Sequence, residues 1–193
     1  DRRTAALIAP DGNVAWLCWA WIDSTPLFFS LLDDQRGGRF SVRPARGDAR
    51  VVSRRYHPRS LVLETIWEVG AARLTVEDAL ALAGGPRLIR SVRSQGEPID
   101  VIVAVSAPRW PGADAGISTS GNSLEVRTGG ATVVVRAAGE WVSANDEIQC
   151  RLVVQLNAHE QITLSTSGTV AQPAGGAQIV PAWHRLILEG APA

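Results

Sequence analysis

The sequence contains no lysine, no methionine and only two cysteines in 193 residues. Every basic residue is an arginine, and 19 arginines balance 19 acidic residues to give a formal net charge of zero. Nucleic-acid binding depends on positive charge gathered on one surface, and these arginines are scattered along the chain. We therefore expect no nucleic-acid partner. A lysine-free composition with abundant alanine, glycine and valine is typical of a GC-rich bacterial genome.

Long apolar runs are also absent, since no stretch approaches the roughly 20 apolar residues that a membrane-spanning helix needs. The start of the chain has no charged-then-apolar leader, so we expect a soluble protein with no membrane partner. Cys18 and Cys150 are too few and too far apart for a disulfide framework. This favours two buried thiols in a cytoplasmic protein, with a single bridge as the open alternative. The missing initiator methionine suggests a piece of a longer polypeptide.

The three histidines, His57, His159 and His184, stand alone in the sequence, without a partner at the spacing of metal ligands. We predict no zinc site and no cofactor.

Short apolar runs separated by glycine, proline or asparagine fill most of the sequence. Residues 4–9 and 14–19 flank Pro-Asp-Gly-Asn, which is typical of a β-hairpin. Apolar residues alternate along 61–69 and 99–105, as expected of strands with one buried face. Similar runs occupy residues 39–43, 50–57, 72–77, 87–93, 123–128, 131–137, 148–156 and 160–166. This spacing predicts an all-β fold, an antiparallel β-sandwich over residues 1–170.

Helical periodicity is nearly absent. We expect one or two short helical turns, over Leu27–Leu32 after Ser24 and Pro26, and over Val180–Leu188. The glycine pairs at 37–38, 84–85, 129–130 and 175–176 fall between strands and are expected to form turns, not phosphate-binding loops. Residues 171–193 are rich in proline and glycine, which predicts an irregular tail or the start of a linker.

Acidic residues occur in pairs that resemble the carboxylates of a glycoside hydrolase: Asp33 with Asp34, Glu64 with Glu68, and Glu77 with Asp78. Such enzymes need two carboxyl groups facing each other across a cleft. Adjacent residues on a strand point to opposite faces, so Glu77 and Asp78 cannot form that pair by themselves. No serine lies in a Gly-x-Ser-x-Gly motif and neither cysteine has a histidine partner in sequence. The chain alone is not predicted to be an enzyme.

Seven tryptophans stand beside one tyrosine and three phenylalanines. Large rings gain most from burial, so we expect Trp16 and Trp67, which lie among alternating apolar residues, in the core. Trp21 precedes Asp23, Ser24 and a chain reversal, and it is the candidate for exposure. Because indole rings also stack on sugars, a carbohydrate-binding module that holds α-glucan or trehalose is the alternative function.

Several segments resemble the opening of the bacterial trehalase-like and glucoamylase-like proteins of glycoside hydrolase family 15. The matching segments are Arg3–Leu7, Asp11–Val14, Trp16–Trp19, Asp23-Ser24, Leu31–Asp33, Gly37–Phe40, Arg55-Tyr56, Leu63–Thr65, Leu74–Val76 with Asp78, and Leu88–Val92. In that family an N-terminal sandwich of the super-sandwich type precedes an (α/α)6-barrel. The barrel carries the two catalytic glutamates, which act by inversion. The resemblance therefore implies no catalytic residue in this chain.

The chain departs from the family pattern at residues 19–24, where Trp-Ala-Trp-Ile-Asp-Ser replaces the usual Trp-Pro-Arg-Phe-Asp-Ser. Trp19, Trp21, Asp23 and Ser24 are our candidates for contact with substrate or with another domain. The resemblance implies a C-terminal catalytic barrel of the same polypeptide as the partner. An α-glucoside sugar is a further candidate partner, and whether the exposed surface also binds a second copy is left open by the sequence. A self-contained hydrolase is the weakest hypothesis.

Overall fold

The structure is a computed structural model that describes residues 4–19, 21–81, 85–110, 115–128, 131–144 and 147–166. Within these ranges the chain forms strands and no helix. The strands are β1 (Ala6–Ile8), β2 (Val14–Cys18), β3 (Pro26–Phe28), β4 (Arg39–Pro44), β5 (Arg50–Tyr56), β6 (Leu63–Val69), β7 (Ala72–Leu80), β8 (Arg87–Gln95), β9 (Ile99–Ser106), β10 (Gly116–Ser120), β11 (Ser123–Thr128), β12 (Ala131–Arg136), β13 (Trp141–Ala144), β14 (Glu147–Val154) and β15 (His159–Thr166).

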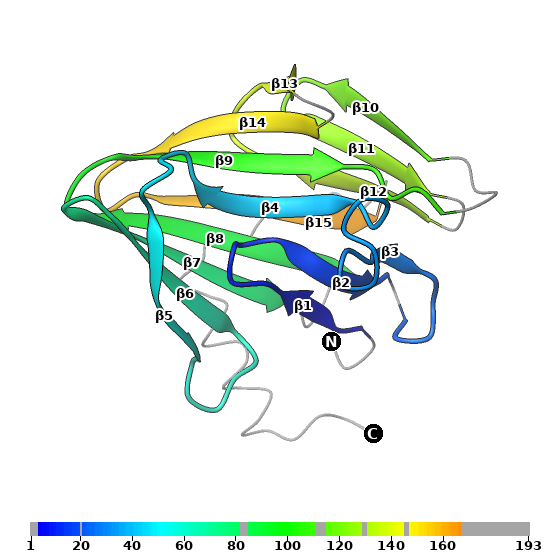
Figure 1. The fold of residues 1–193 in the computed structure, drawn as a ribbon, viewed down its shortest axis with the longest axis horizontal. Coiled ribbons are helices and arrows are strands. Elements are labelled where there is room, and N and C mark those ends of the chain that lie inside the picture. Colours follow the sequence, from blue (N-terminus) through cyan, green and yellow to red (C-terminus); the bar gives the residue numbers. More distant parts are fainter. Residues whose placement is uncertain are drawn as a thin grey trace.

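These strands form two layers. One layer is an eight-stranded sheet in the order β10-β11-β12-β15-β8-β7-β6-β5. The other contains a four-stranded sheet, β13-β14-β9-β4, and a three-stranded sheet, β1-β2-β3. A bridge between Asn13 and Ser41 and a hydrogen bond from Val42 N to Gly12 O, 3.2 Å long, connect these two smaller sheets. Figure 1 shows β14, β9 and β4 side by side, with β1 to β3 gathered below β4.

Every pairing between strands of the described part is antiparallel, which confirms the predicted sandwich. The predicted hairpin over residues 4–19 is also confirmed, and its turn uses Gly12 at φ +81°, a conformation that favours glycine. No helix within the described residues is long and apolar enough to cross a membrane.

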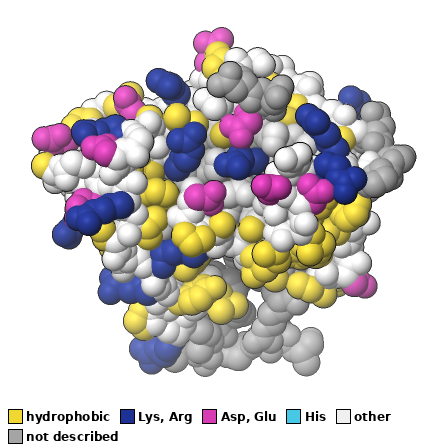
Figure 2. All heavy atoms as spheres, in the orientation of Figure 1, with side chains coloured by type: hydrophobic (Ala, Val, Ile, Leu, Met, Phe, Trp, Pro, Cys, Tyr) yellow, Lys and Arg dark blue, Asp and Glu magenta, His cyan; other side chains and the backbone are white. Residues whose placement is uncertain are grey.

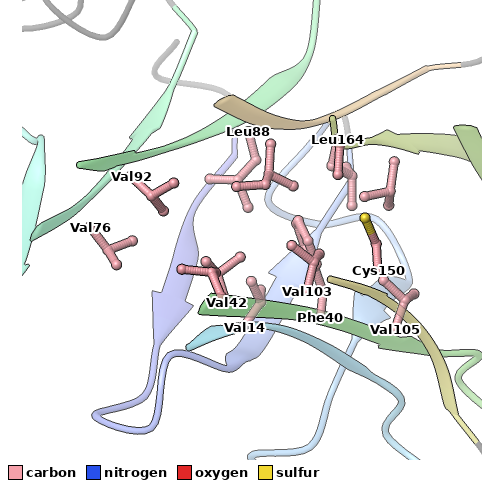
Figure 3. Packing of buried hydrophobic residues seen from close by; sticks show 14 of the residues in the cluster. Val14, Phe40, Val42, Val76, Leu88, Val92, Val103, Val105, Cys150 and Leu164 are labelled. Atoms are coloured by element: carbon pink, nitrogen blue, oxygen red, sulfur yellow. The ribbon is translucent and has the colours of Figure 1, made fainter. Parts of the chain in front are cut away.

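The core lies between the two layers and contains the alternating apolar residues that were predicted on β9. On β9, Ile99, Val101, Val103 and Val105 are at most 4% exposed. Figure 3 shows how the inward-facing side chains of the two layers meet. Each fully buried aliphatic side chain stabilises the fold by about 1.5–3 kcal/mol. This one cluster includes residues from both layers. Cys18 and Cys150 are both buried and form no disulfide, so the prediction of two buried thiols is confirmed.

The expected helical turn over Leu27–Leu32 is wrong. Residues 26–28 form β3, in which Leu27 and Phe28 are almost fully buried, and Phe28 pairs with Leu17 of β2. A turn at residues 30–32 follows, in which Phe29 O accepts hydrogen bonds from Leu32 N and Asp33 N. Residues 26–28 are extended because they pair with β2. The local sequence does not reveal that pairing. The second expected turn, at 180–188, and the tail at 171–193 lie outside the described residues.

Two predictions about tryptophan have different outcomes. Trp67 is 8% exposed and belongs to the core, as predicted. Trp16 is only half-buried, and it lies opposite Leu7 of the edge strand β1, which is itself 50% exposed. The expectation of Trp16 in the core is therefore corrected.

Candidate functional site

The most unusual surface of the described part surrounds β3. We use the name β3 loops for residues 21–25 and 29–37. Four large apolar side chains in these loops, Trp21, Ile22, Leu31 and Leu32, are 53%, 61%, 59% and 70% exposed. Figure 2 shows hydrophobic side chains gathered over the lower part of one face, where Figure 1 places β1 to β3, and charged side chains across the upper part. The two loops lie at opposite ends of the three-residue strand β3, and exposed large apolar side chains of this kind are typical of an interaction surface.

The second β3 loop, residues 29–37, has a firmly anchored backbone. The ring of Phe29 lies against Trp110, with centroids 4.1 Å apart, and the Trp110 indole donates a 3.1 Å hydrogen bond to Pro26 O. Leu31 N donates to Ala15 O at 2.9 Å, and Phe29 N donates to Gly37 O at 2.9 Å. Leu31 and Leu32 therefore stand on a backbone that packing and hydrogen bonds hold in place.

Asp33 closes the second β3 loop. Its Oδ1 accepts hydrogen bonds from Gln35 N and Arg36 N, and its Oδ2 lies 2.6 Å from Arg36 Nε. These hydrogen bonds, the side-chain contact with Arg36 first among them, lower the pKa of Asp33 below its ordinary value. The prediction that Asp33 and Asp34 belong to a turn is confirmed.

The four candidates named from the sequence are not all exposed. Trp19 is 6% exposed, belongs to the core, and directs its indole N–H toward Thr166 Oγ1 at 3.4 Å. Trp21, Asp23 and Ser24 share one turn, in which Ser24 N donates to Trp21 O at 3.1 Å. Trp21 and Asp23 are exposed and Ser24 is half-buried. The accessible part of the candidate site is therefore this turn.

A pocket of about 450 Å³ lies between β1 and the strands β5 to β8. Leu7, Tyr56 and Leu61 on its lining are 50%, 60% and 65% exposed. Arg54 fixes its shape, because its Nη2 donates a 2.5 Å hydrogen bond to Ile8 O and so joins β5 to β1. The sequence did not predict this pocket, because its walls come from segments that meet only in the folded chain.

A polar cluster that the sequence did not predict lies on β6 and β7. His57 Nε2 is 2.8 Å from Glu77 Oε1 and 3.9 Å from Glu64 Oε2. Arg55 Nε donates to Glu64 Oε1 at 2.7 Å. The side chains of His57, Glu64 and Glu77 retain only 22%, 11% and 20% of their exposure. These three residues are the group in the described part that could hold a metal ion.

The cluster follows from strand register. Arg55, Glu64 and Glu77 are directly opposite one another on β5, β6 and β7, so their side chains lie in one row on one face of the sheet. The next residue, Asp78, points to the other face, as the sequence predicted, and there it pairs with Arg90. Two successive hairpins in the order β5-β6-β7 are the signal that could have revealed this row.

The fold defines the chain as an antiparallel β-sandwich domain. The family described as "Trehalase-like, N-terminal" matches residues 1–173. The chain therefore belongs to the trehalase-like N-terminal family, in agreement with the resemblance seen in the sequence.

Individual relatives share a shorter region. The chain is 40% identical over 82 residues to a trehalase of Mycobacterium tuberculosis, a match that covers 42% of this chain and 12% of that protein. A trehalase of Mycolicibacterium smegmatis gives the same identity and coverage. A trehalase of Thermoplasma volcanium is 30% identical over 109 residues, covering 53% of this chain and 18% of that protein. The chain thus spans less than a fifth of the length of these relatives.

A solved structure described as "Putative kojibiose phosphorylase from human microbiome" aligns with 79% of this chain and 26% of its own, at 12% identity and a TM-score of 0.39. A likeness of that size supports no conclusion about function.

Proposed function

We propose that this chain is the non-catalytic N-terminal domain of a glycoside hydrolase family 15-like α-glucosidase of the trehalase or glucoamylase type. In this proposal it packs against an (α/α)6-barrel catalytic domain of the same polypeptide and supports it. The single observation that carries the proposal is the set of exposed apolar side chains on the two β3 loops. The family match and the names of the relatives support the enzyme class.

The chemistry of the β3 loops favours a protein surface as the partner. Three of the four exposed side chains, Ile22, Leu31 and Leu32, are aliphatic and offer no flat ring for stacking on a sugar. Burial of a side chain of this size releases about 1.5–3 kcal/mol, which docking of another domain would gain. Only Trp21 has the ring that a carbohydrate-binding surface uses.

The carboxylates of the described part support a non-catalytic role. Glu64 and Glu77, which lie directly opposite each other on one face of the sheet, are engaged with Arg55 and His57. Asp78 is buried with Arg90. A glycoside hydrolase needs its acid and its base on opposite sides of a substrate cleft, whereas Glu64 and Glu77 lie side by side in one row on the sheet and both approach His57.

The test uses the polypeptide encoded by the whole gene. Replacing Leu31 and Leu32 with aspartate should loosen the contact between domains, so that limited proteolysis separates them faster and trehalose or maltose hydrolysis is lost at a lower temperature. Val142→Asp is the matched control, because Val142 is 51% exposed on β13, at the far edge of the four-stranded sheet from β4. Equal effects of both changes, or no effect of either, would count against the proposal.

The carbohydrate-binding alternative depends on Trp21. Titration of the chain with trehalose or maltooligosaccharide at millimolar concentration should leave tryptophan fluorescence unchanged if docking is the function. Quenching that disappears in Trp21→Ala would support the alternative.

Size-exclusion chromatography with light scattering tests whether the same surface forms a homodimer. The free, buried thiols favour a cytoplasmic location, which fractionation of the source cells would test.

A further inference from the structure

We propose that His57, Glu64 and Glu77 form a binding site for a divalent transition-metal ion, with Zn²⁺ as the ion that the ligand set fits best. One imidazole and two carboxylates are ligands that zinc accepts in proteins, and three protein ligands leave a fourth position for water. The site is independent of the β3 loops and of the proposed docking function.

The distances suit a metal ion at the centre of the three side chains. Their nearest ligand atoms all lie within 4.8 Å of one another. Two ligands of a tetrahedral zinc are about 3.3 Å apart when each is 2.0–2.1 Å from the metal. The His57 Nε2 distances of 2.8 Å to Glu77 and 3.9 Å to Glu64 lie on either side of that value. Small rotations of the side chains would therefore complete the geometry.

A separate observation points to a ligand at this place. Ser91 lies directly opposite Glu77 on β8, so its side chain stands beside Glu77 on the same face of the sheet. Ser91 is 2% exposed, and its hydroxyl has no hydrogen-bond partner among the described residues. A buried hydroxyl without a partner is unfavourable. A water molecule on the fourth position of the metal would supply that partner.

The surroundings hold the ligands in place before a metal binds. Arg55 engages Glu64 Oε1 and leaves Oε2 on the side of His57, the outer-shell arrangement that metal-binding carboxylates commonly have. The backbone of His57 is fixed by the loop that leads to β6. Its backbone N–H donates to Val62 O at 3.0 Å, and its carbonyl oxygen accepts from Ser60 N at 3.1 Å. Two carboxylates against one guanidinium leave a net negative charge that attracts a cation.

The experiment is calorimetric titration of the EDTA-treated chain with Zn²⁺, with thermal unfolding as a second measurement. We expect one ion per chain and a rise in Tm of about 5–10 °C at a hundredfold excess over Kd. His57→Gln and Glu77→Gln should each weaken binding by about 10-fold or more. His159→Gln is the control, because His159 is exposed on β15, away from the cluster, and it should bind Zn²⁺ as the unsubstituted chain does.

Two further measurements keep the test decisive. Tm values without metal show whether each variant is folded, and Co²⁺ in place of Zn²⁺ should give the visible absorption of a four-coordinate site that His57→Gln lacks. Absence of stoichiometric Zn²⁺ binding, equal affinity in folded His57→Gln, or equal losses in His57→Gln and His159→Gln would each overturn the proposal.

Discussion

Arg90 and Asp78 form an ion pair inside the sandwich, with Arg90 Nε 2.6 Å from Asp78 Oδ1 and side-chain exposures of 0% and 3%. The two residues are directly opposite on β8 and β7. The guanidinium also donates to Phe40 O at 3.2 Å and lies 5.2 Å from the centre of the Phe40 ring. This pair therefore joins the eight-stranded sheet to β4 of the opposite layer.

Removing one member of the pair should destabilise the fold strongly. Asp78→Ala leaves a buried guanidinium without its counter-charge, and we expect a loss of about 3–5 kcal/mol in the free energy of unfolding. Urea unfolding of the purified chain measures this loss. Asp48→Ala is the control, because Asp48 pairs with Arg46 on the surface, where both side chains are more than half exposed; it should change nothing measurable. Similar losses in both variants would contradict this account.

Gly37 should not tolerate a side chain. A Cβ atom at this position would overlap the backbone of Phe29 and Ser30 in the second β3 loop. We expect Gly37→Ala to destabilise the chain by about 1–3 kcal/mol, as overpacking does elsewhere. Gly47→Ala, where a Cβ meets nothing within 4 Å, should stay within about 0.5 kcal/mol. A Gly37→Ala chain as stable as Gly47→Ala would show that this loop adapts freely.

The two thiols predict a loss of stability at alkaline pH. Burial raises the pKa of Cys18 and of Cys150, and the effect is partly offset by hydrogen bonds. The contribution of each protonated thiol to the free energy of unfolding is therefore fully present below the pKa of a cysteine in the unfolded chain, about 8.5. As pH rises from there through the folded pKa, the unfolded state releases its proton first and this contribution is lost. Urea midpoints between about pH 7 and pH 10 should fall more steeply for the unsubstituted chain than for Cys150→Ala. Parallel slopes would contradict the prediction.

Exposed and anchoring residues of the β3 loops should differ in their effect on stability. Leu31→Ala removes a side chain that is 59% exposed, so the isolated chain should change by at most about 0.5 kcal/mol. Trp110→Ala removes the ring that packs on Phe29, and such aromatic pairs contribute about 0.5–1.5 kcal/mol beyond their burial. Thermal unfolding compares the two. If Leu31→Ala were the more damaging change, Leu31 would belong to the core and not to a docking surface.

Most strands that carry the core could be predicted from the sequence because apolar residues recur at every second position between turn residues. On β9, Ile99, Val101, Val103 and Val105 are all buried, and Ile102 and Ala104 between them are buried as well. β10 was missed because its residues are mostly exposed and polar, so that only pairing with β11 defines it. β3 was missed because Pro26 followed by an apolar run also fits the start of a helix.

The side-chain clusters could not be predicted for a related reason. His57, Glu64 and Glu77 are brought together by the register of β5, β6 and β7, which alternation alone does not fix. The same holds for Asp78 and Arg90. The exposure of Trp21, by contrast, was expected from the neighbouring turn residues, and the structure has it 53% exposed.

Glucose release from trehalose and maltose by the purified chain, measured beside Glu64→Gln and Glu77→Gln, tests the central claim most directly. If the domain docks against a separate catalytic barrel, the chain and both variants release no glucose above the buffer rate. Turnover by the chain that is abolished in either variant would place catalysis within these residues and contradict the account.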